Sequence, residues 1–176
     1  MKHIMNCNQR IEQWLNIRKD AFESEIRPFV TLSYAQSWGG SITTKRGQPV
    51  VLSGADSNLL THQLRSLHDG ILVGIDTVLA DDPQLTVRYW SGENPQPIIL
   101  DTALRMPKNA RLCHHPDKDC WVFTTRIPAE NEFSGVEIIP LVDMRPSTPA
   151  RISTAQSAME NRNNGVARMI VEVFSV

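Results

Sequence analysis

Four side chains between positions 65 and 88 have the types and the spacing that a polar, anionic ligand requires. Thr77 and Asp81 are four residues apart, so in a helical turn their hydroxyl and carboxylate face the same way and can hydrogen-bond a ribose or a polar ring. Arg65 and Arg88 each carry a guanidinium fork that matches the oxygens of a phosphate. These residues predict a crevice that favours a polyanionic ligand.

Each of these residues also has a plain structural alternative. Arg65 falls in the last turn of a predicted helix, where a cation complements the helix dipole, and Arg88 could be an ordinary solvated group. Asp81 and Asp82 could bind a divalent cation, but two adjacent carboxylates before Pro83 more often shape a turn. The residue types alone leave these alternatives open.

A second polar cluster could in principle hold a metal ion, because cysteine and histidine are soft ligands. Its members are Cys113, His114, His115 and Cys120. The intervening residues 116–119 are Pro, Asp, Lys and Asp, which is typical of a tight turn that joins two extended runs, and we expect no metal there. The sequence also lacks a G-x-S-x-G elbow, a P-loop lysine motif and a G-x-G-x-x-G fingerprint.

The elements that would position the crevice alternate between helices and strands. A helix that Ser53 or Asp56 caps is predicted to lead through a break at 69–70 into a short buried strand at 71–73. Its apolar face carries three leucines, Leu60, Leu64 and Leu67. Gly74 then opens the polar turn that carries Thr77 and Asp81.

Further runs rich in apolar and β-branched residues predict the other strands, at 29–34, 41–44, 50–52, 97–100, 121–125, 136–139 and from 169 onward. Residues 103–115 are predicted to be a loop, and 152–162 show weak helical periodicity. This alternation predicts an α/β domain with a mixed, largely parallel sheet flanked by helices. The last run, 171–176, predicts a strand beyond which the next sheet edge lies uncovered.

Residues 1–27 are predicted to form a helical extension ahead of a domain at 28–176. Apolar side chains recur at helical steps and give one stripe, made of Ile11, Trp14, Leu15 and Phe22. Pro28 ends this helix because the residue before a proline is pushed out of the helical region. We expect the apolar stripe to pack on the domain or on a partner.

The composition limits the class of protein and the kinds of partner. A chain of 176 residues with 41% hydrophobic and 21% charged residues is typical of one globular domain. A formal net charge of -1 excludes a basic stripe for nucleic acid, and no run approaches the roughly 18 apolar residues of a membrane span. Three cysteines without framework spacing fit a reducing compartment, so we expect a cytoplasmic protein.

Several segments around the crevice share one extended pattern. They are T-L-S-Y-A-Q-S at 31–37, L-S-G at 52–54, T-H-Q-L-R at 61–65, H-D-G-I-L-V-G-I-D-T-V-L-A-D-D-P-Q-L-T-V-R at 68–88, P-I-I-L-D-T-A-L-R at 97–105 and I-V-E at 170–172. Together they resemble the pyrimidine reductase of riboflavin biosynthesis, over about residues 28–125 and again near the end. Tyr34-Ala35-Gln36 and Thr61-His62 are more similar to the stand-alone branch than to the branch fused to a deaminase in bacteria.

The resemblance implies a dihydrofolate-reductase-like fold and chemistry that depends on NADPH. The family reduces the ribosylamino group of a 5′-phosphorylated pyrimidine to a ribitylamino chain, so a hydride would reach C1′ of an opened, imine-like substrate. By position in the motifs, NADPH would contact Ala35, Thr77, Asp81 and Thr102, and the substrate would contact Arg65, Leu85, Arg88 and Glu172. Family members pair through their sheets, so a homodimer is a further expectation.

Two departures from the family pattern lie beside the expected cofactor site. Trp38-Gly39-Gly40 replaces the family's L-D-G, which removes an aspartate, and residues 173–176 replace a glycine-rich turn that cradles phosphates. The resemblance therefore implies a chain truncated before the last strands of the fold. The alternatives to an active reductase are a non-catalytic member of the same family and, from the shared fold, a folate-type reductase.

Overall fold

The structure is a computed structural model, and it describes residues 6–22, 29–36, 54–126, 133–141 and 168–173. The strands expected at 41–44 and 50–52, the glycine loop at 38–40 and the helix expected at 152–162 lie outside the described residues. The same is true of Ser53 and Pro28. Within the described part of the chain, we find no helix with the length and apolarity that a membrane span requires.

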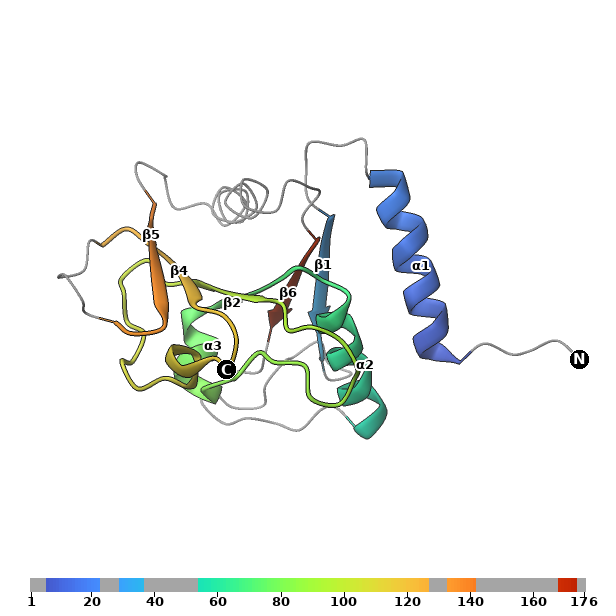
Figure 1. The fold of residues 1–176 in the computed structure, drawn as a ribbon, viewed down its shortest axis with the longest axis horizontal. Coiled ribbons are helices and arrows are strands. Elements are labelled where there is room, and N and C mark those ends of the chain that lie inside the picture. Colours follow the sequence, from blue (N-terminus) through green and yellow to red (C-terminus); the bar gives the residue numbers. More distant parts are fainter. Residues whose placement is uncertain (1–5, 23–28, 37–53, 127–132, 142–167, 174–176) are drawn as a thin grey trace, which may run out of the picture.

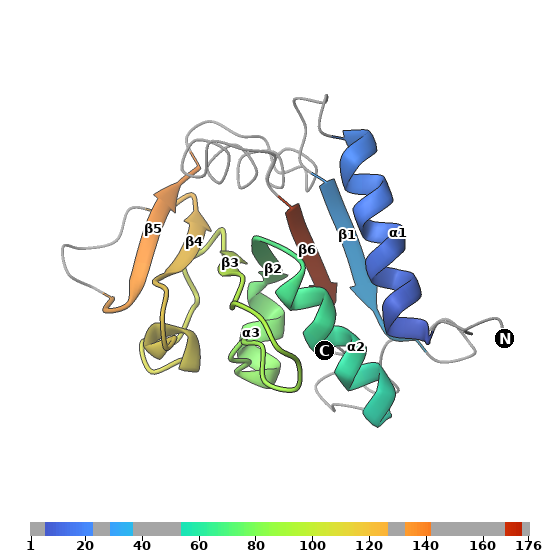
Figure 2. The ribbon, with the colours of Figure 1, turned by 45° about the vertical axis from the view of Figure 1, so that its right-hand side comes forward.

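The described strands form one six-stranded sheet in the order β1-β6-β2-β3-β4-β5, and all five strand pairs are parallel (Figures 1 and 2). The strands are β1 (Phe29–Tyr34), β2 (Gly70–Gly74), β3 (Gln96–Leu100), β4 (Cys120–Thr124), β5 (Val136–Pro140) and β6 (Arg168–Val173). The prediction of an α/β domain with a largely parallel sheet is confirmed. The strands from 29 to 34 and near 71, 97, 121, 136 and 169 were each predicted from their apolar runs.

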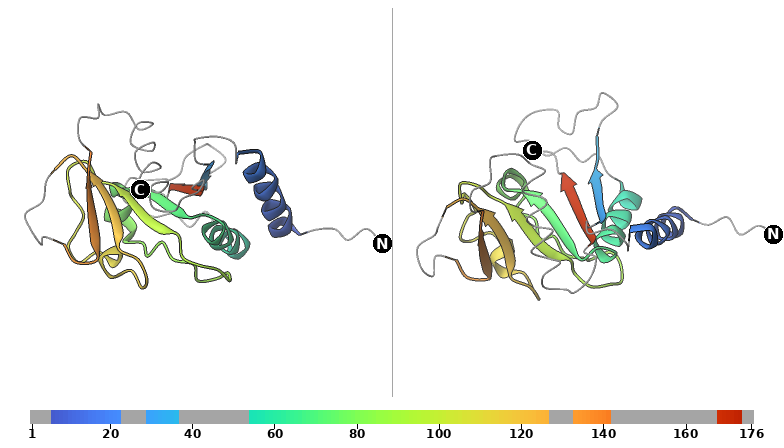
Figure 3. Two further views of the ribbon diagram at one scale, coloured as in Figure 1. Left: turned by 45° about the horizontal axis from the view of Figure 1, so that its top comes forward. Right: turned by 90° about the horizontal axis from the view of Figure 1, so that it is seen from above.

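The last described strand, β6, lies inside the sheet between β1 and β2 (Figure 3). The expectation of an uncovered edge beyond this strand is therefore wrong, since both of its neighbours are paired strands. Its first residue is held by Asp69, whose carboxylate accepts bonds from the Arg168 backbone N–H and guanidinium at 2.7 and 2.8 Å. Glu172, near its other end, forms an ion pair described below. Charged side chains thus hold both ends of β6.

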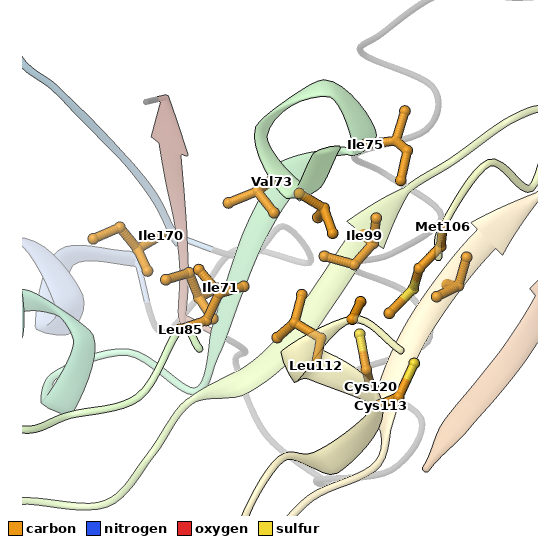
Figure 4. Close-up of a cluster of buried hydrophobic side chains, with 13 residues drawn as sticks. Ile71, Val73, Ile75, Leu85, Ile99, Met106, Leu112, Cys113, Cys120 and Ile170 are labelled. Carbon is orange, nitrogen blue, oxygen red and sulfur yellow. The ribbon is translucent and has the colours of Figure 1, made fainter. Parts of the chain in front are cut away.

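Side chains from the sheet build a core on each face, as the alternation of a strand requires. On one face, Ile71, Val73, Ile99, Val122 and Ile170 form a cluster that is covered by α3 (Ile75–Asp81) and by the short 3-10 helix η1 (Arg111–His114) (Figure 4). The other face carries Leu72, Ile98, Trp121, Phe123 and Met169. The face covered by α3 and η1 matters for the candidate site, because α3 carries Thr77 and Asp81.

Helix α2 (Ala55–Ser66) precedes β2 and presents a polar face to the interior. Its N-cap is Gly54 and makes no side-chain capping bond, so the expected cap by Asp56 is wrong; Asp56 lies in the first turn instead. The buried residues of α2 are His62, Gln63 and Arg65, while the predicted stripe of Leu60, Leu64 and Leu67 is only partly buried. Buried polar side chains and the apolar contact of Leu64 with the core together fix this helix to its surroundings.

Helix α1 (Cys7–Phe22) lies at the side of the molecule beside β1 and α2 (Figure 2). Its contact with α2 is a reciprocal amide pair, in which Asn8 Nδ2 donates to Gln63 Oε1 at 2.6 Å and Gln63 Nε2 donates to the Asn8 carbonyl at 3.1 Å. Leu15 is buried, as the predicted stripe requires, but Trp14 is 51% exposed and lies under Arg18. Trp14 therefore does not pack on the described domain, and its packing on a partner, the other expectation, stays a prediction.

Candidate functional site

The parallel sheet brings most of the sequence-predicted site residues to one edge. Ala35 directly follows β1, Glu172 is the next-to-last residue of β6, and Thr102 follows β3 by two residues. Gly74 ends β2, and the chain passes from it directly into α3. Because the carboxyl ends of parallel strands meet at the same edge, these residues share the edge at which α/β sheets bind ligands.

Helix α3 carries the expected hydroxyl and carboxylate. Thr77 and Asp81 both lie in this helix, so the turn after Gly74 is helical and the two residues share a face. Thr77 is buried, Asp81 is half-buried, and burial raises the pKa of the Asp81 carboxyl. Asp82 has a different environment: it ends the helix in a left-handed conformation, and its Oδ1 accepts the Arg111 backbone N–H at 2.8 Å. Asp82 thus shapes the turn.

A buried carboxylate fixes the turn that carries Thr102. Asp101 is fully buried, and its Oδ2 accepts the Met106 backbone N–H at 2.8 Å. The Thr102 carbonyl accepts bonds from the hydroxyls of Thr124 and Thr125 at 3.1 and 2.9 Å. The ends of β3 and β4 are therefore joined at the edge where ligands are expected.

Arg65 and Glu172 form a buried, bidentate ion pair. Nε of Arg65 donates to Oε1 of Glu172 at 2.9 Å and Nη2 donates to Oε2 at 2.7 Å, while Nη1 donates to the Thr86 carbonyl at 3.0 Å. The two side chains are 5% and 4% exposed. The structure brings these predicted substrate residues together, but each nitrogen of the guanidinium has a protein partner and the group has little contact with solvent.

Leu85 and Arg88 lie in the segment that follows α3. The Leu85 side chain is buried, whereas the Arg88 side chain is exposed. Leu85 is 1% exposed and packs in the core beside Ile71 (Figure 4), with a backbone φ of 56°. Arg88 is exposed; its Nη1 donates to Gln84 Oε1 at 3.0 Å, and its guanidinium carbon lies 5.9 Å from the Tyr89 ring centroid. Arg88 is therefore the predicted arginine that an incoming anion can reach.

Sequence analysis missed two side chains that hold this segment. His62 appeared within the motif T-H-Q-L-R and in the similarity to the stand-alone branch, without a role of its own, and Asn94 was not singled out. In the structure, the Arg88 backbone N–H donates to His62 Nδ1 at 3.1 Å, and the Val87 backbone N–H donates to Asn94 Oδ1 at 2.7 Å. No local pattern signalled the first contact, because His62 and Arg88 are 26 residues apart in the chain.

No group of three or more His, Cys, Asp or Glu side chains within the described ranges is arranged to hold a metal ion. Cys113 and Cys120, considered above as ligands, are both buried thiols. Burial raises the pKa of each, which keeps the sulfur protonated and poorly suited to bind a metal.

Three buried histidines are expected to make the fold sensitive to acid. Burial lowers the pKa of His62 to about 4, with Arg65 and Arg88 contributing, and also lowers the pKa of His68 and His115. His68 is buried between the Leu64 carbonyl at 2.6 Å and the Thr31 hydroxyl at 2.7 Å, a geometry that suits a neutral ring. The unfolded state therefore binds more protons than the native state as the pH falls.

The free energy of unfolding should be greatest above pH 6.5, the ordinary histidine pKa, and should fall toward pH 4. The loss approaches roughly 1.4 kcal/mol per pH unit for each titrating group. Urea denaturation at pH 7.5, 5.5 and 4.5 measures it, and His68→Gln should show a shallower dependence than the wild type. Stability that is independent of pH over this range would contradict the assignment of neutral rings.

Comparisons with known proteins agree on one family. The family described as "RibD C-terminal domain" matches residues 28–172. A Candida glabrata protein named 2,5-diamino-6-ribosylamino-4(3H)-pyrimidinone 5′-phosphate reductase is 39% identical over 143 residues, which cover 72% of this chain and 57% of that protein. The chain thus spans little more than half the length of this relative.

Two solved structures share the fold of this chain, and each is 28% identical to it in sequence. A Thermotoga maritima diaminohydroxyphosphoribosylaminopyrimidine deaminase/5-amino-6-(5-phosphoribosylamino)uracil reductase aligns with a TM-score of 0.69 at 28% identity, over 88% of this chain and 41% of that protein. The Saccharomyces cerevisiae riboflavin biosynthesis reductase Rib7 aligns with a TM-score of 0.63 at 28% identity, over 93% of this chain and 72% of that one. The six-stranded parallel sheet flanked by helices is the architecture of these reductases.

Proposed function

Because the chain belongs to the RibD C-terminal domain family, we propose that it reduces the ribosylamino group of a 5′-phosphorylated pyrimidine to the ribitylamino form, with NADPH as the reductant. The observation that carries this proposal is the location of the α3 hydroxyl and carboxylate after the carboxyl end of β2, together with the exposed guanidinium of Arg88 in the segment that follows α3. The name of the relative from C. glabrata supports the substrate class.

The residues beside the carboxyl end of β2 fit a dinucleotide cofactor in their chemistry. An atom added at the Cβ position of Gly74 would meet none of the described residues within 4 Å, so these residues leave room for a ligand beside this strand end. We assign Ala35, Thr77, Asp81 and Thr102 to NADPH, since hydroxyl, carboxylate and backbone groups suit ribose hydroxyls and a carboxamide. Bound there, NADPH would supply the hydride that C1′ of the opened substrate accepts.

On the substrate side, we assign the phosphate to Arg88. Its side chain is exposed, and a guanidinium offers several donors in a planar fork, which matches phosphate oxygens. Arg65, Leu85 and Glu172 complete the proposed substrate wall. Since the Arg65 guanidinium is engaged by Glu172 and Thr86, we propose that this pair shapes the wall rather than binding the phosphate.

Binding of NADPH to the purified chain is the direct test of the cofactor assignment. A ligand that binds the native state alone stabilises it, so NADPH at about 100 times its Kd should raise the free energy of unfolding by about 2.7 kcal/mol. Asp81→Asn should reduce this gain, whereas Arg18→Ala, on α1, should leave it unchanged. Absence of any thermal shift with NADPH would favour the alternative, a non-catalytic member of the family.

A further inference from the structure

The segment from Leu85 to Arg88 is held in a conformation that its own sequence does not favour. Leu85 has a backbone φ of 56°, which is a left-handed conformation. This conformation is unfavourable for any residue that carries a Cβ. Its side chain is locked in the core, where it is 1% exposed. The surrounding structure must therefore fix the backbone that leads from this buried leucine to the exposed Arg88.

Three side chains from outside the segment hold the residues that follow Leu85, one after another. The contacts are Arg65 Nη1 to the Thr86 carbonyl at 3.0 Å, the Val87 N–H to Asn94 Oδ1 at 2.7 Å, and the Arg88 N–H to His62 Nδ1 at 3.1 Å. We call His62, Arg65 and Asn94 the backbone clamp. Each contact uses a backbone group, so the clamp sets where the Arg88 side chain begins without touching its guanidinium.

Every member of the clamp is itself oriented. Arg65 is fixed by its bidentate pair with Glu172, and Asn94 donates its amide to both oxygens of Asp117 at 3.1 and 3.2 Å, which turns its carbonyl oxygen toward Val87. The His62 ring is 3% exposed and packs edge-on against Tyr89, with ring centroids 4.9 Å apart. Two members of the clamp, His62 and Arg65, are therefore buried supports, while Asn94 is oriented by an exposed contact with Asp117.

The contact at His62 requires a neutral ring with the proton on Nε2. Nδ1 can accept the Arg88 N–H only through its lone pair. Burial lowers the pKa of the ring, as do Arg65 on its own helix and Arg88 on the facing segment, and these effects outweigh the Thr86 backbone, which raises that pKa. The ring thus keeps its acceptor at neutral pH because its surroundings are cationic and dry.

We propose that His62 is a positioning residue, which through its bond to the Arg88 backbone sets the guanidinium where it meets the phosphate of the substrate. The inference rests on the proposed function, in which Arg88 binds that phosphate. It assigns His62 no contact with the reacting atoms. The effect of His62 should therefore appear in the KM for a phosphorylated substrate and not in kcat.

Three substitutions on one helix separate this role from a merely structural one. His62→Leu removes the acceptor, His62→Asn keeps an acceptor oxygen at the position of Nδ1, and Gln63→Leu removes a buried polar side chain whose bonds go to α1 instead. His62→Leu should raise the KM for the phosphorylated pyrimidine about tenfold, the factor that one hydrogen bond of about 1.4 kcal/mol sets, with kcat nearly unchanged. His62→Asn should restore most of the loss, and Gln63→Leu should cause none.

Two measurements without turnover test the clamp even in a chain that lacks activity. Hydrogen exchange at the Arg88 amide should accelerate about tenfold or more in His62→Leu but not in Gln63→Leu. Inorganic phosphate should shift the NMR signals of Arg88 at lower concentration in the wild type than in His62→Leu. If the chain shows no turnover but both effects are observed, the proposed function is refuted, while the role of the clamp in positioning Arg88 is supported.

A second variant, Asn94→Leu, tests the same clamp from the loop side and does not alter α2. It should also raise the KM for the phosphorylated substrate and accelerate exchange at the Val87 amide. The inference would be overturned if His62→Leu and Gln63→Leu changed kcat and KM by the same factors. Unchanged hydrogen exchange at the Arg88 amide in His62→Leu would also overturn it. Those outcomes would make His62 an ordinary buried residue of α2.

Discussion

Replacing Arg65 by methionine is expected to lower the free energy of unfolding by about 3–5 kcal/mol. The substitution keeps an unbranched, apolar side chain but leaves the Glu172 carboxylate buried at 4% exposure without its partner. An unpaired charge in a dry site costs far more than the lost attraction alone. The Thr86 carbonyl also loses its donor. Urea denaturation of the purified chain at pH 7.5 measures the change.

The chain offers a matched control for this prediction. Arg105 also bonds a carboxylate at 2.8 Å, that of Asp76, but these side chains are 48% and 62% exposed. Arg105→Met should therefore cost no more than about 1 kcal/mol, since solvent screens an exposed pair. The double variant Arg65→Met/Glu172→Leu should recover much of the loss, because both charges are gone. Similar costs for Arg65→Met and Arg105→Met would show that the Arg65 pair is not buried in solution.

Replacing Arg88 by alanine is expected to raise the KM for the phosphorylated pyrimidine about 10–100-fold, since hydrogen bonds to charged groups contribute about 1.5–3 kcal/mol. Arg88 is exposed and its side chain contacts Gln84 and Tyr89 at the surface, so the fold should tolerate the change. Steady-state kinetics with the phosphorylated substrate and with its phosphate-free counterpart measure the effect.

The phosphate-free substrate supplies the internal control. Arg88→Ala should leave its kcat/KM nearly unchanged, because the lost contact is to the phosphate. Arg18→Ala, at an exposed arginine on α1, should leave kcat/KM unchanged for both substrates. An equal loss for both substrates would mean that Arg88 acts on the ring or the chain of the substrate and not on its phosphate.

Arg65 and Arg88 also show where sequence analysis reaches its limit. Both are arginines beside an apolar pattern, and the same phosphate chemistry was expected of both. Their difference comes from Glu172, which stands 107 residues after Arg65 and meets it only because β6 returns between β1 and β2. A partner at that separation follows from the strand order, which the local pattern does not contain.

Local features were predicted well for the opposite reason. The strand over 29–34 agrees with β1 in both bounds, and the helix α2 and the strand β2 follow from the residue pattern between 55 and 74, whereas the residues of α3 were expected to form a polar turn. The buried polar face of α2 was not predicted, since His62 and Gln63 are buried by hydrogen bonds to Arg88 and Asn8 rather than by apolar periodicity. Such residues are recognisable only once their partners are in place.

The assignments of Thr77 and Asp81 to the cofactor stay predictions, as do those of Ala35 and Thr102. What the fold adds is their common location at the carboxyl edge of a parallel sheet. In the proposed function, the reductant and the phosphorylated substrate meet at this location.

The central claim is that this chain transfers a hydride to the sugar carbon of a phosphorylated ribosylaminopyrimidine. The most direct measurement incubates the chain with that substrate and NADPH deuterated at C4 of the nicotinamide, and then locates the label in the product by mass spectrometry. The account predicts one deuterium on C1′ of the ribityl chain and a matching amount of NADP⁺. Recovery of unreduced substrate with NADPH intact, or a label on the pyrimidine ring, would contradict it.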